Sequence, residues 1–275
     1  MLTTLLLLLA AQETTLTAPT VEAAPTLDGK ADDACWSKAK ELKVAVVEAM
    51  DNTKGKSTVT VKAVRKGDEL YLLLQWKDES ESAQHKPWVW DKEKNEYIEA
   101  TDVEDCAVVS FALSGEFDAN MLAGIESTWD VWHWKAARTN PAGFAMDKRH
   151  IYSEKKSDAK AMKYRAINDK DIWISRPEDG GGSATKKTPK PEKLTDKVVQ
   201  QSTAQTPAGS AADVKAKGAW KDGVWTLELC RKLKTGNEDD AVFEPGKAIP
   251  FAIAILDASE EEHSASGKLS LLIEK

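Results

Sequence analysis

Hydrophobic and polar residues alternate with a period of two along much of the chain, and this pattern predicts β-strands. The segment 58–64 (TVTVKAV) alternates as expected of a strand with one buried face. The segment 69–76 (ELYLLLQW) follows it after Lys66-Gly67-Asp68, a typical hairpin turn. The best candidate for a short amphipathic helix is 30–42. The same alternation predicts further strands at 106–113, 130–136, 224–230, 250–256 and 269–273.

Several strands and few helices indicate an all-β fold, an antiparallel β-sandwich of immunoglobulin or jelly-roll type. The chain has 275 residues, and we expect one sandwich domain over 26–275. Within it, 176–217 contains GGGS, KKTPKPEK and TPAGSAAD and no aromatic residue. This composition predicts a long, largely flexible surface insertion.

The start of the chain has an apolar run at 5–11. A membrane span needs about 20 apolar residues, so this run predicts no span. Its length and the small residues after it are typical of a signal peptide, although a positively charged start is missing. We therefore expect a signal peptide at 1–12, a linker at 13–25, and export, for example to the periplasm. The alternative is a buried N-terminal strand.

Charge and cysteine spacing exclude several classes of partner and site. The net charge is −7, whereas a nucleic-acid-binding protein would show a basic patch. The three cysteines, Cys35, Cys106 and Cys230, form no C-x-x-C, which excludes zinc-ribbon spacing, a thioredoxin motif and covalent c-type haem attachment. One disulfide with a leftover thiol and three buried free thiols both stay open.

Motifs for catalysis are not present, so the sequence predicts a binding protein and not an enzyme. Gly55-Lys56-Ser57 lacks the earlier glycine of a P-loop, because Met50 stands there. A G-x-S-x-G elbow is absent, and the histidines show no metal-ligand spacing. Asp102, Glu104 and Asp105 precede a predicted strand, where we expect a solvated acidic cluster.

Tryptophan is the residue type that stands out. Ten are present, and three lie in 129–135 (WDVWHWK). On a strand, Trp132 and Trp134 share one face, while His133 and Lys135 share the other. Such a stripe lines a flat apolar pocket for a planar cofactor, forms a stacking platform for sugars, or packs in an ordinary core.

The segment 129–147 (WDVWHWKAARTNPAGFAMD) resembles the signature of the ethylbenzene-dehydrogenase gamma-subunit-like haem-binding domains. The opening TLDGKAD at 26–32, followed by Trp36, is similar to the start of these domains, of family-9 carbohydrate-binding modules and of DOMON-like sandwiches. The resemblance runs from about residue 25 to the end, without the insertion. Other matching pieces lie at 69–78, 105–113, 223–231 and 250–272.

This resemblance implies a sandwich that holds one haem b non-covalently and passes electrons without substrate turnover of its own. The implied partner is a redox protein, either an oxidoreductase subunit or a c-type cytochrome. Met121 occupies the place of the methionine axial ligand in some members. Their lysine ligand would lie near Arg231, where this chain departs from the pattern.

The second axial ligand is therefore open, and His263, in a loop before the last strand, is the leading candidate, with His133 as a third option. Lys135 and Arg138 would meet the haem propionates or are sheet-surface charges. The alternative function is a carbohydrate-binding module without haem, in which the tryptophans stack on sugar rings.

Overall fold

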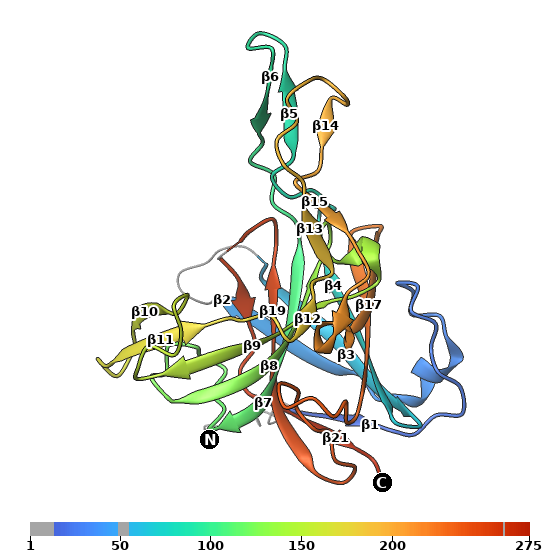
Figure 1. Ribbon diagram of the computed structural model, residues 1–275. Helices are drawn as coiled ribbons and strands as arrows, with labels where there is room; N and C mark the ends of the chain where they lie inside the picture. The colour runs from blue at the N-terminus through green and yellow to red at the C-terminus, as the bar shows by residue number, and fades with distance from the viewer. Residues whose placement is uncertain (1–13, 49–54, 261) are drawn as a thin grey trace, which may run out of the picture.

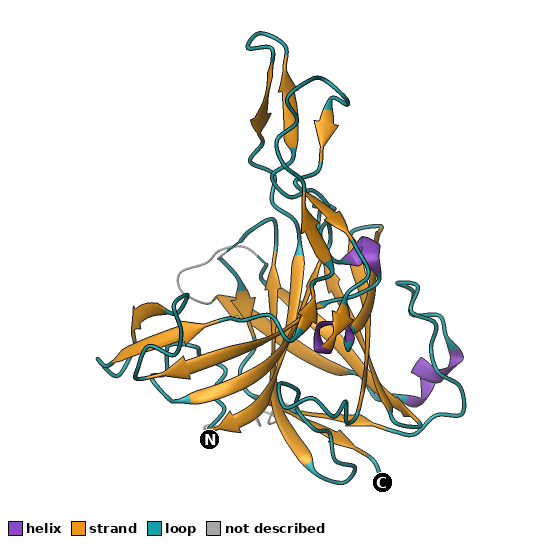
Figure 2. Cartoon of the chain, in the orientation of Figure 1, coloured by secondary structure: helices purple, strands orange, loops and turns teal. Residues whose placement is uncertain are grey.

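The computed structural model describes residues 14–48, 55–260 and 262–275, and strands make up nearly all of its regular structure (Figure 2). The expected all-β antiparallel sandwich is confirmed. The helices of the described ranges are short 3₁₀ turns: η1 (Ala34–Lys38), η2 (Asn140–Ala142) and η3 (Ser210–Ala212). None of the described segments forms a helix with the length and apolar character that crossing a bilayer requires.

Two layers of strands form the sandwich (Figure 1). β20 (Ser264–Ala265) connects them by pairing with both β19 and β2, and β21 (Leu269–Ile273) also pairs with β19. The first layer runs in the order β10 (Met162–Arg165), β11 (Asp171–Ser175), β9 (Met146–Ser153), β8 (Ser127–Lys135), β7 (Cys106–Gly115) and β19 (Ala248–Leu256). The second layer runs β2 (Leu42–Glu48), β3 (Ser57–Lys66), β4 (Glu69–Lys77), β18 (Val224–Lys232) and β17 (Lys215–Lys221).

The main core lies between the two layers and is built from alternate residues of each strand. β4 contributes Leu70, Leu72 and Leu74, and each is at most 1% exposed. Burial of such side chains stabilises a fold by roughly 1.5–3 kcal/mol each. The period-two pattern was therefore a sound basis for predicting the strands, and all seven predicted strands are present as β3, β4, β7, β8, β18, β19 and β21.

The predicted helix at 30–42 is wrong. The chain makes only the 3₁₀ turn η1 there, and β2 begins at Leu42. The sequence LKVAVVE of β2 alternates and is rich in valine, which favours a strand. Val44 and Val46 are buried on its core side.

The segment 13–25 is not a free linker. β1 (Thr15–Ala18) pairs in parallel with β21, and Leu16 and Ala18 are buried in the core. The predicted signal peptide at 1–12 lies outside the described residues. Further along, Trp36 and Val21 pack on the outer face of the second layer, and Trp36 Nε1 donates to Glu228 Oε1 at 3.2 Å.

The insertion at 176–217 was expected to be largely flexible, but it forms several short strands. β14 (Val198–Val199) pairs with β5 (Trp88–Asp91), which pairs with β6 (Glu96–Glu99). These three strands form an arm that projects from the sandwich (Figure 1). The Tyr97 hydroxyl accepts hydrogen bonds from the backbone N–H groups of Thr195 and Asp196, and so ties the insertion to β6. The remaining short strands are β12 (Gly181–Gly182), β13 (Thr185–Lys187), β15 (Ser202–Ala204) and β16 (Ala208–Gly209).

All three cysteines are free thiols in the structure. Cys106 and Cys230 are buried, and Cys35 is half-buried. Burial raises the pKa of the Cys230 thiol to about 12, so it is an unreactive core group at neutral pH. Of the two possibilities left open by the sequence, the structure has the free thiols.

Candidate functional site

The two faces of β8 have different surroundings. Trp132 and Trp134 point into the main core and are 0% exposed. Trp132 packs at 4.8 Å from Phe111, and Trp134 makes an edge contact with Trp225 at 5.0 Å between ring centroids. The interpretation of these tryptophans as the lining of a cofactor slot or a sugar platform is therefore wrong, because the molecule's own side chains cover their rings.

The opposite, outer face of β8 and β9 carries a basic cluster. His133 and Lys135 of β8 lie there, as predicted from the alternation. Lys148 pairs with Val131, and His150 pairs with Trp129, so both β9 side chains project from the same face. We call His133, Lys135, Lys148 and His150 the basic cluster.

Positive charge in this cluster is poorly compensated. The Lys148 ammonium lies 3.0 Å from His133 Nδ1, and the Lys135 ammonium lies 3.6 Å from the sulfur of Met146. Within the described part of the chain, neither ammonium has a carboxylate at ion-pair distance. Burial, followed by the charge of Lys135, lowers the pKa of Lys148 to about 7. Burial also lowers the pKa of Lys135.

Both histidines of the cluster have a ring nitrogen without a partner. Nε2 of His133 and Nε2 of His150 are buried and make no hydrogen bond in the structure. Burial and then the charge of Lys148 lower the pKa values of both rings well below the usual value, so both are neutral at pH 7. An unpaired buried polar atom costs roughly 1–3 kcal/mol. A bound group that accepts or coordinates at these atoms would remove this cost.

Met121 lies on the loop between β7 and β8, above the same outer face. It packs on the apolar cluster that contains Trp129 and Tyr152. Met121, Trp129 and Tyr152 also line a small cavity of about 10 Å³, which is room for about one water molecule. The Tyr152 hydroxyl lies 3.3 Å from His150 Nδ1. The structure thus brings the predicted methionine to the side of the sheet that carries the imidazoles.

The other predicted residues lie around this face. His263 is half-buried in the loop before β20, and its charge contributes to the lowered pKa of His150. Arg138 follows β8, and its guanidinium donates to the carboxylate of Glu104. Glu104 also accepts from the backbone N–H of Ala137 at 2.6 Å.

The expectation of a solvated acidic cluster at the start of β7 is correct for Asp102, which is exposed, and wrong for Glu104 and Asp105. Glu104 and Asp105 are at most 1% exposed. Asp105 accepts hydrogen bonds from the backbone of Ser82 and Ala258 and from Trp225 Nε1. These two carboxylates are structural anchors for the loops around them.

Lys148 and His150 are the site residues that the sequence reasoning missed. The signal was present in β9, whose sequence MDKRHIYS places Met146, Lys148, His150 and Tyr152 on one face. No strand was predicted there because the residues on that face are largely polar.

The side chains on this face include donor atoms that suit a haem, whereas the cavity beside Met121 is too small for a haem in this conformation. Thioether sulfur and neutral imidazole nitrogen are both iron ligands, and buried cations suit carboxylate groups. A ligand of drug size needs a pocket of roughly 300–1,000 Å³. The cavity of about 10 Å³ beside Met121 means that the loop 116–126 must move for a porphyrin to enter.

Comparisons with known proteins define the family. The fold is an all-β antiparallel sandwich, and the family model for ethylbenzene dehydrogenase matches residues 33–267. Because this match spans most of the chain, the protein belongs to the ethylbenzene dehydrogenase family. No curated protein matches the chain.

Solved structures with a similar fold include carbohydrate-binding sandwiches. A Bacteroides uniformis protein proposed to bind carbohydrate has 12% identity and a TM-score of 0.48, with 94% of this chain and 90% of that chain covered. A family-9 carbohydrate-binding module from Caldicellulosiruptor kristjanssonii, solved with glucose, has 10% identity and a TM-score of 0.42, with 94% and 95% covered. The same module with cellotriose has 10% identity and a TM-score of 0.41, with 94% and 93% covered.

Proposed function

We propose that this chain is a haem b-binding electron-transfer domain that works with an oxidoreductase and catalyses no reaction by itself. The observation that carries the proposal is the basic cluster with its two unpartnered imidazole nitrogens, on the outer face that Met121 also covers. His150 lies 3.3 Å from the Tyr152 hydroxyl, and Tyr152 lines the cavity beside Met121. Membership of the ethylbenzene dehydrogenase family supports the same reading.

The proposed roles follow from the position of each group. Met121 and an imidazole, that of His263 or of His150, hold the iron, while Lys135 and Lys148 attract the propionate carboxylates. When bound, the haem supplies one-electron chemistry at its iron. Trp129 and Tyr152 exclude water from the face, and Arg138 holds the following turn through Glu104.

The proposal includes a redox partner protein, either an oxidoreductase subunit or a c-type cytochrome, and export of the chain to a compartment such as the periplasm. Export rests on the apolar run at 5–11. Electron transfer between the haem and such a partner requires only that one edge of the bound group lies near the surface.

The test is an absorption spectrum of the full chain after addition of haem. We expect a shifted Soret band and, on reduction, sharp alpha and beta bands. Met121→Ala is expected to change this spectrum, because it removes the sulfur ligand. Met162→Ala is the matched control, since Met162 is 58% exposed on β10 and should leave the spectrum unchanged.

The histidine variants identify the second ligand. One of the two variants, His263→Ala or His150→Ala, is expected to change the alpha band as much as Met121→Ala does. That variant has lost the imidazole ligand. A chain that shows no shifted Soret band at any haem concentration refutes the proposal.

A further inference from the structure

An acidic cluster lies on the inner side of the same two strands, at one edge of the main core. Three carboxylates, from β8, β9 and the loop after β18, place oxygen atoms within 4.8 Å of one another: Asp130, Asp147 and Asp240. Asp240 also belongs to a second group of the same dimensions with Asp179 and Asp239. We call these five residues the acidic cluster.

Hydrogen bonds satisfy only part of the cluster. Arg231 donates through Nη1 to Asp130 Oδ2 and, at 2.9 Å, to Asp240 Oδ1. The backbone N–H of Ala241 donates to Asp130 Oδ2 at 2.8 Å. Five buried carboxylate oxygens have no hydrogen-bond partner: Oδ1 of Asp130 and both oxygens of Asp147 and Asp179.

Asp147 is the informative residue because it is buried and entirely unpaired. It is 1% exposed, and neither of its oxygens accepts a hydrogen bond. On β9 it pairs with Trp132 of β8, and the backbone N–H of Asp179 donates to its backbone oxygen at 3.1 Å, so Asp147 and Asp179 are direct neighbours. Burial of an ionised carboxylate without a partner costs folding free energy, so buried carboxylates normally pair with a cation.

The cations that the chain itself supplies do not balance the cluster. Arg231 lies within it, and Arg149 Nε lies 3.4 Å from Asp179 Oδ1. With all five carboxylates ionised, two guanidinium groups leave a net charge of −3. A divalent cation would leave −1.

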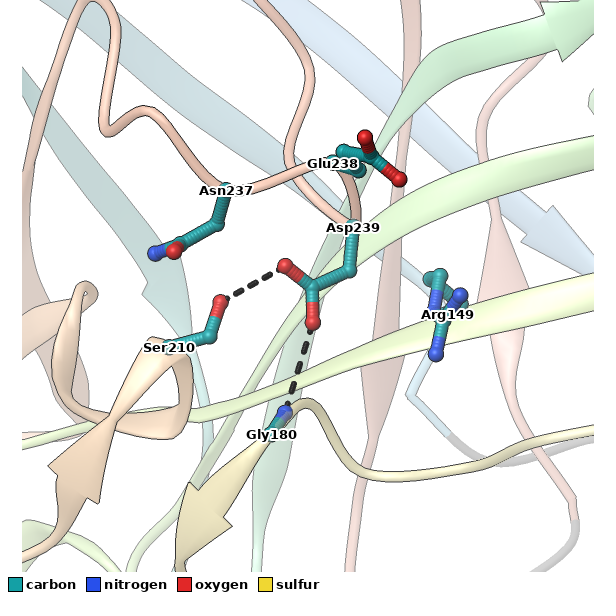
Figure 3. A pocket seen from close by; sticks show the side chains of 6 residues that line it. All are labelled: Arg149, Gly180, Ser210, Asn237, Glu238 and Asp239. Carbon is teal, nitrogen blue, oxygen red and sulfur yellow. Dashed lines mark hydrogen bonds between the residues drawn. The ribbon is translucent and has the colours of Figure 1, made fainter.

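A pocket gives access to the cluster from solvent. It has a volume of about 420 Å³, and Asp239 lies on its wall next to Gly180 and Arg149 (Figure 3). Figure 3 shows Asp239 held by the Ser210 hydroxyl and by the backbone N–H of Gly180. Asp239 is thus shared between the pocket and the second group of carboxylates, so water and ions reach the cluster there.

We propose that the acidic cluster binds a divalent cation of the calcium type beside Asp240, the residue common to both groups. Asp147 is the ligand from the first group, Asp179 is the ligand from the second, and water from the pocket completes the shell. Ca²⁺ takes six to eight oxygen ligands at 2.3–2.6 Å in variable geometry. Five carboxylate oxygens without a hydrogen bond, beside a pocket that opens to solvent, suit that demand better than the strict octahedron of Mg²⁺. Bound there, the ion ties β9 to the insertion at its first residues. This site is independent of the proposed haem face.

The test uses the full chain after dialysis against a chelator. Addition of CaCl₂ at neutral pH is expected to raise the thermal unfolding temperature by several degrees, and titration calorimetry is expected to show one site per chain. Terbium added in place of calcium should give luminescence on tryptophan excitation, because Trp132 lies 5.0 Å from the Arg231 guanidinium that pairs with the cluster.

Two variants locate the site. Asp147→Asn and Asp179→Asn retain the shape of the side chain and are each expected to weaken calcium binding at least tenfold. Asp78→Asn is the control, because Asp78 belongs to a different acidic group with Asp105 and Asp257 and should leave binding unchanged. Equal unfolding temperatures with chelator and with calcium overturn the proposal. Calcium binding that survives Asp147→Asn and Asp179→Asn but is lost in Asp78→Asn also overturns it.

Discussion

The inner and outer faces of β8 and β9 carry buried charge of opposite sign, although the residues alternate along the same two strands. The inner face holds Asp130 and Asp147, and the outer face holds Lys135 and Lys148. The two faces differ in what neutralises this charge. Arg231 enters the inner face from the other layer of the sandwich, whereas on the outer face neither Lys135 nor Lys148 has a carboxylate of the described residues at ion-pair distance.

This difference leaves buried charge on each face that the described side chains do not fully neutralise. Buried ions need partners, since the desolvation of an unpaired ion costs several kcal/mol. On the inner face a protein cation supplies part of the compensation, and a metal ion would supply the rest. On the outer face the lysines lack protein carboxylates, which favours a bound group with carboxylates of its own.

The largest effect is expected from loss of the inner cation. Arg231→Met leaves Asp130 and Asp240 buried without their guanidinium partner and is expected to lower the free energy of unfolding by roughly 3–5 kcal/mol. Urea denaturation of the purified variant measures this value. The neighbouring exposed residue provides the control, and Lys232→Met should change stability by less than about 0.5 kcal/mol. A loss below about 1 kcal/mol for Arg231→Met would show that the inner face is balanced by other means.

The sequence was sufficient to predict the fold where core-facing residues are apolar. β3 alternates valine with polar residues, β4 has leucine at every second position from Leu70 to Leu74, and both form as predicted. β9 was not predicted, because both of its faces carry charged residues that become buried only after the layers pack. The period-two rule detects apolar burial and has no means to detect burial of charge.

Prediction of the two candidate sites required even more knowledge of the tertiary structure than prediction of the strands. Met121, His133 and Lys135 were named from the sequence and lie on the outer face. The acidic cluster was not predicted, because its carboxylates come from separate segments of the chain. Their proximity depends on the register between β8 and β9 and on the path of the chain after β11.

The second-largest expected effect is a rise in stability between pH 7 and 10, caused by Lys148 on the outer face. The pKa of Lys148 is about 7 in the folded chain, against about 10.4 when unfolded, so the folded state holds fewer protons between these values. Its contribution to stability is complete above about pH 10.4 and is lost as the pH falls through 7. We expect Lys148→Met to stabilise the chain by on the order of 2–4 kcal/mol at pH 6.5 and to remove most of the rise in stability between pH 7 and 10.

Urea denaturation at several pH values compares the variant with the parent chain. Lys155→Met, at an exposed residue just after β9, should retain the parent pH dependence. If Lys148→Met keeps the same alkaline rise as the parent, Lys148 is not the group responsible. Bound haem should also reduce this rise, because its carboxylates would stabilise the charged lysine.

The smallest expected effect comes from Asp179 on the inner face, where stability falls as the pH rises. Burial, followed by the charge of Asp239, raises the pKa of Asp179 to about 7, against about 3.9 when unfolded. Its contribution is therefore complete below about pH 3.9 and is lost as the pH rises through 7. Because the cluster borders a solvent-accessible pocket, we expect a loss of about 1–2 kcal/mol over this window in calcium-free buffer. Asp179→Asn should abolish that loss in urea denaturation at pH 5 and pH 8, and calcium should abolish it in the parent chain. If the loss of stability persists in Asp179→Asn, another carboxylate causes it. Asp147→Asn would then be the variant to compare.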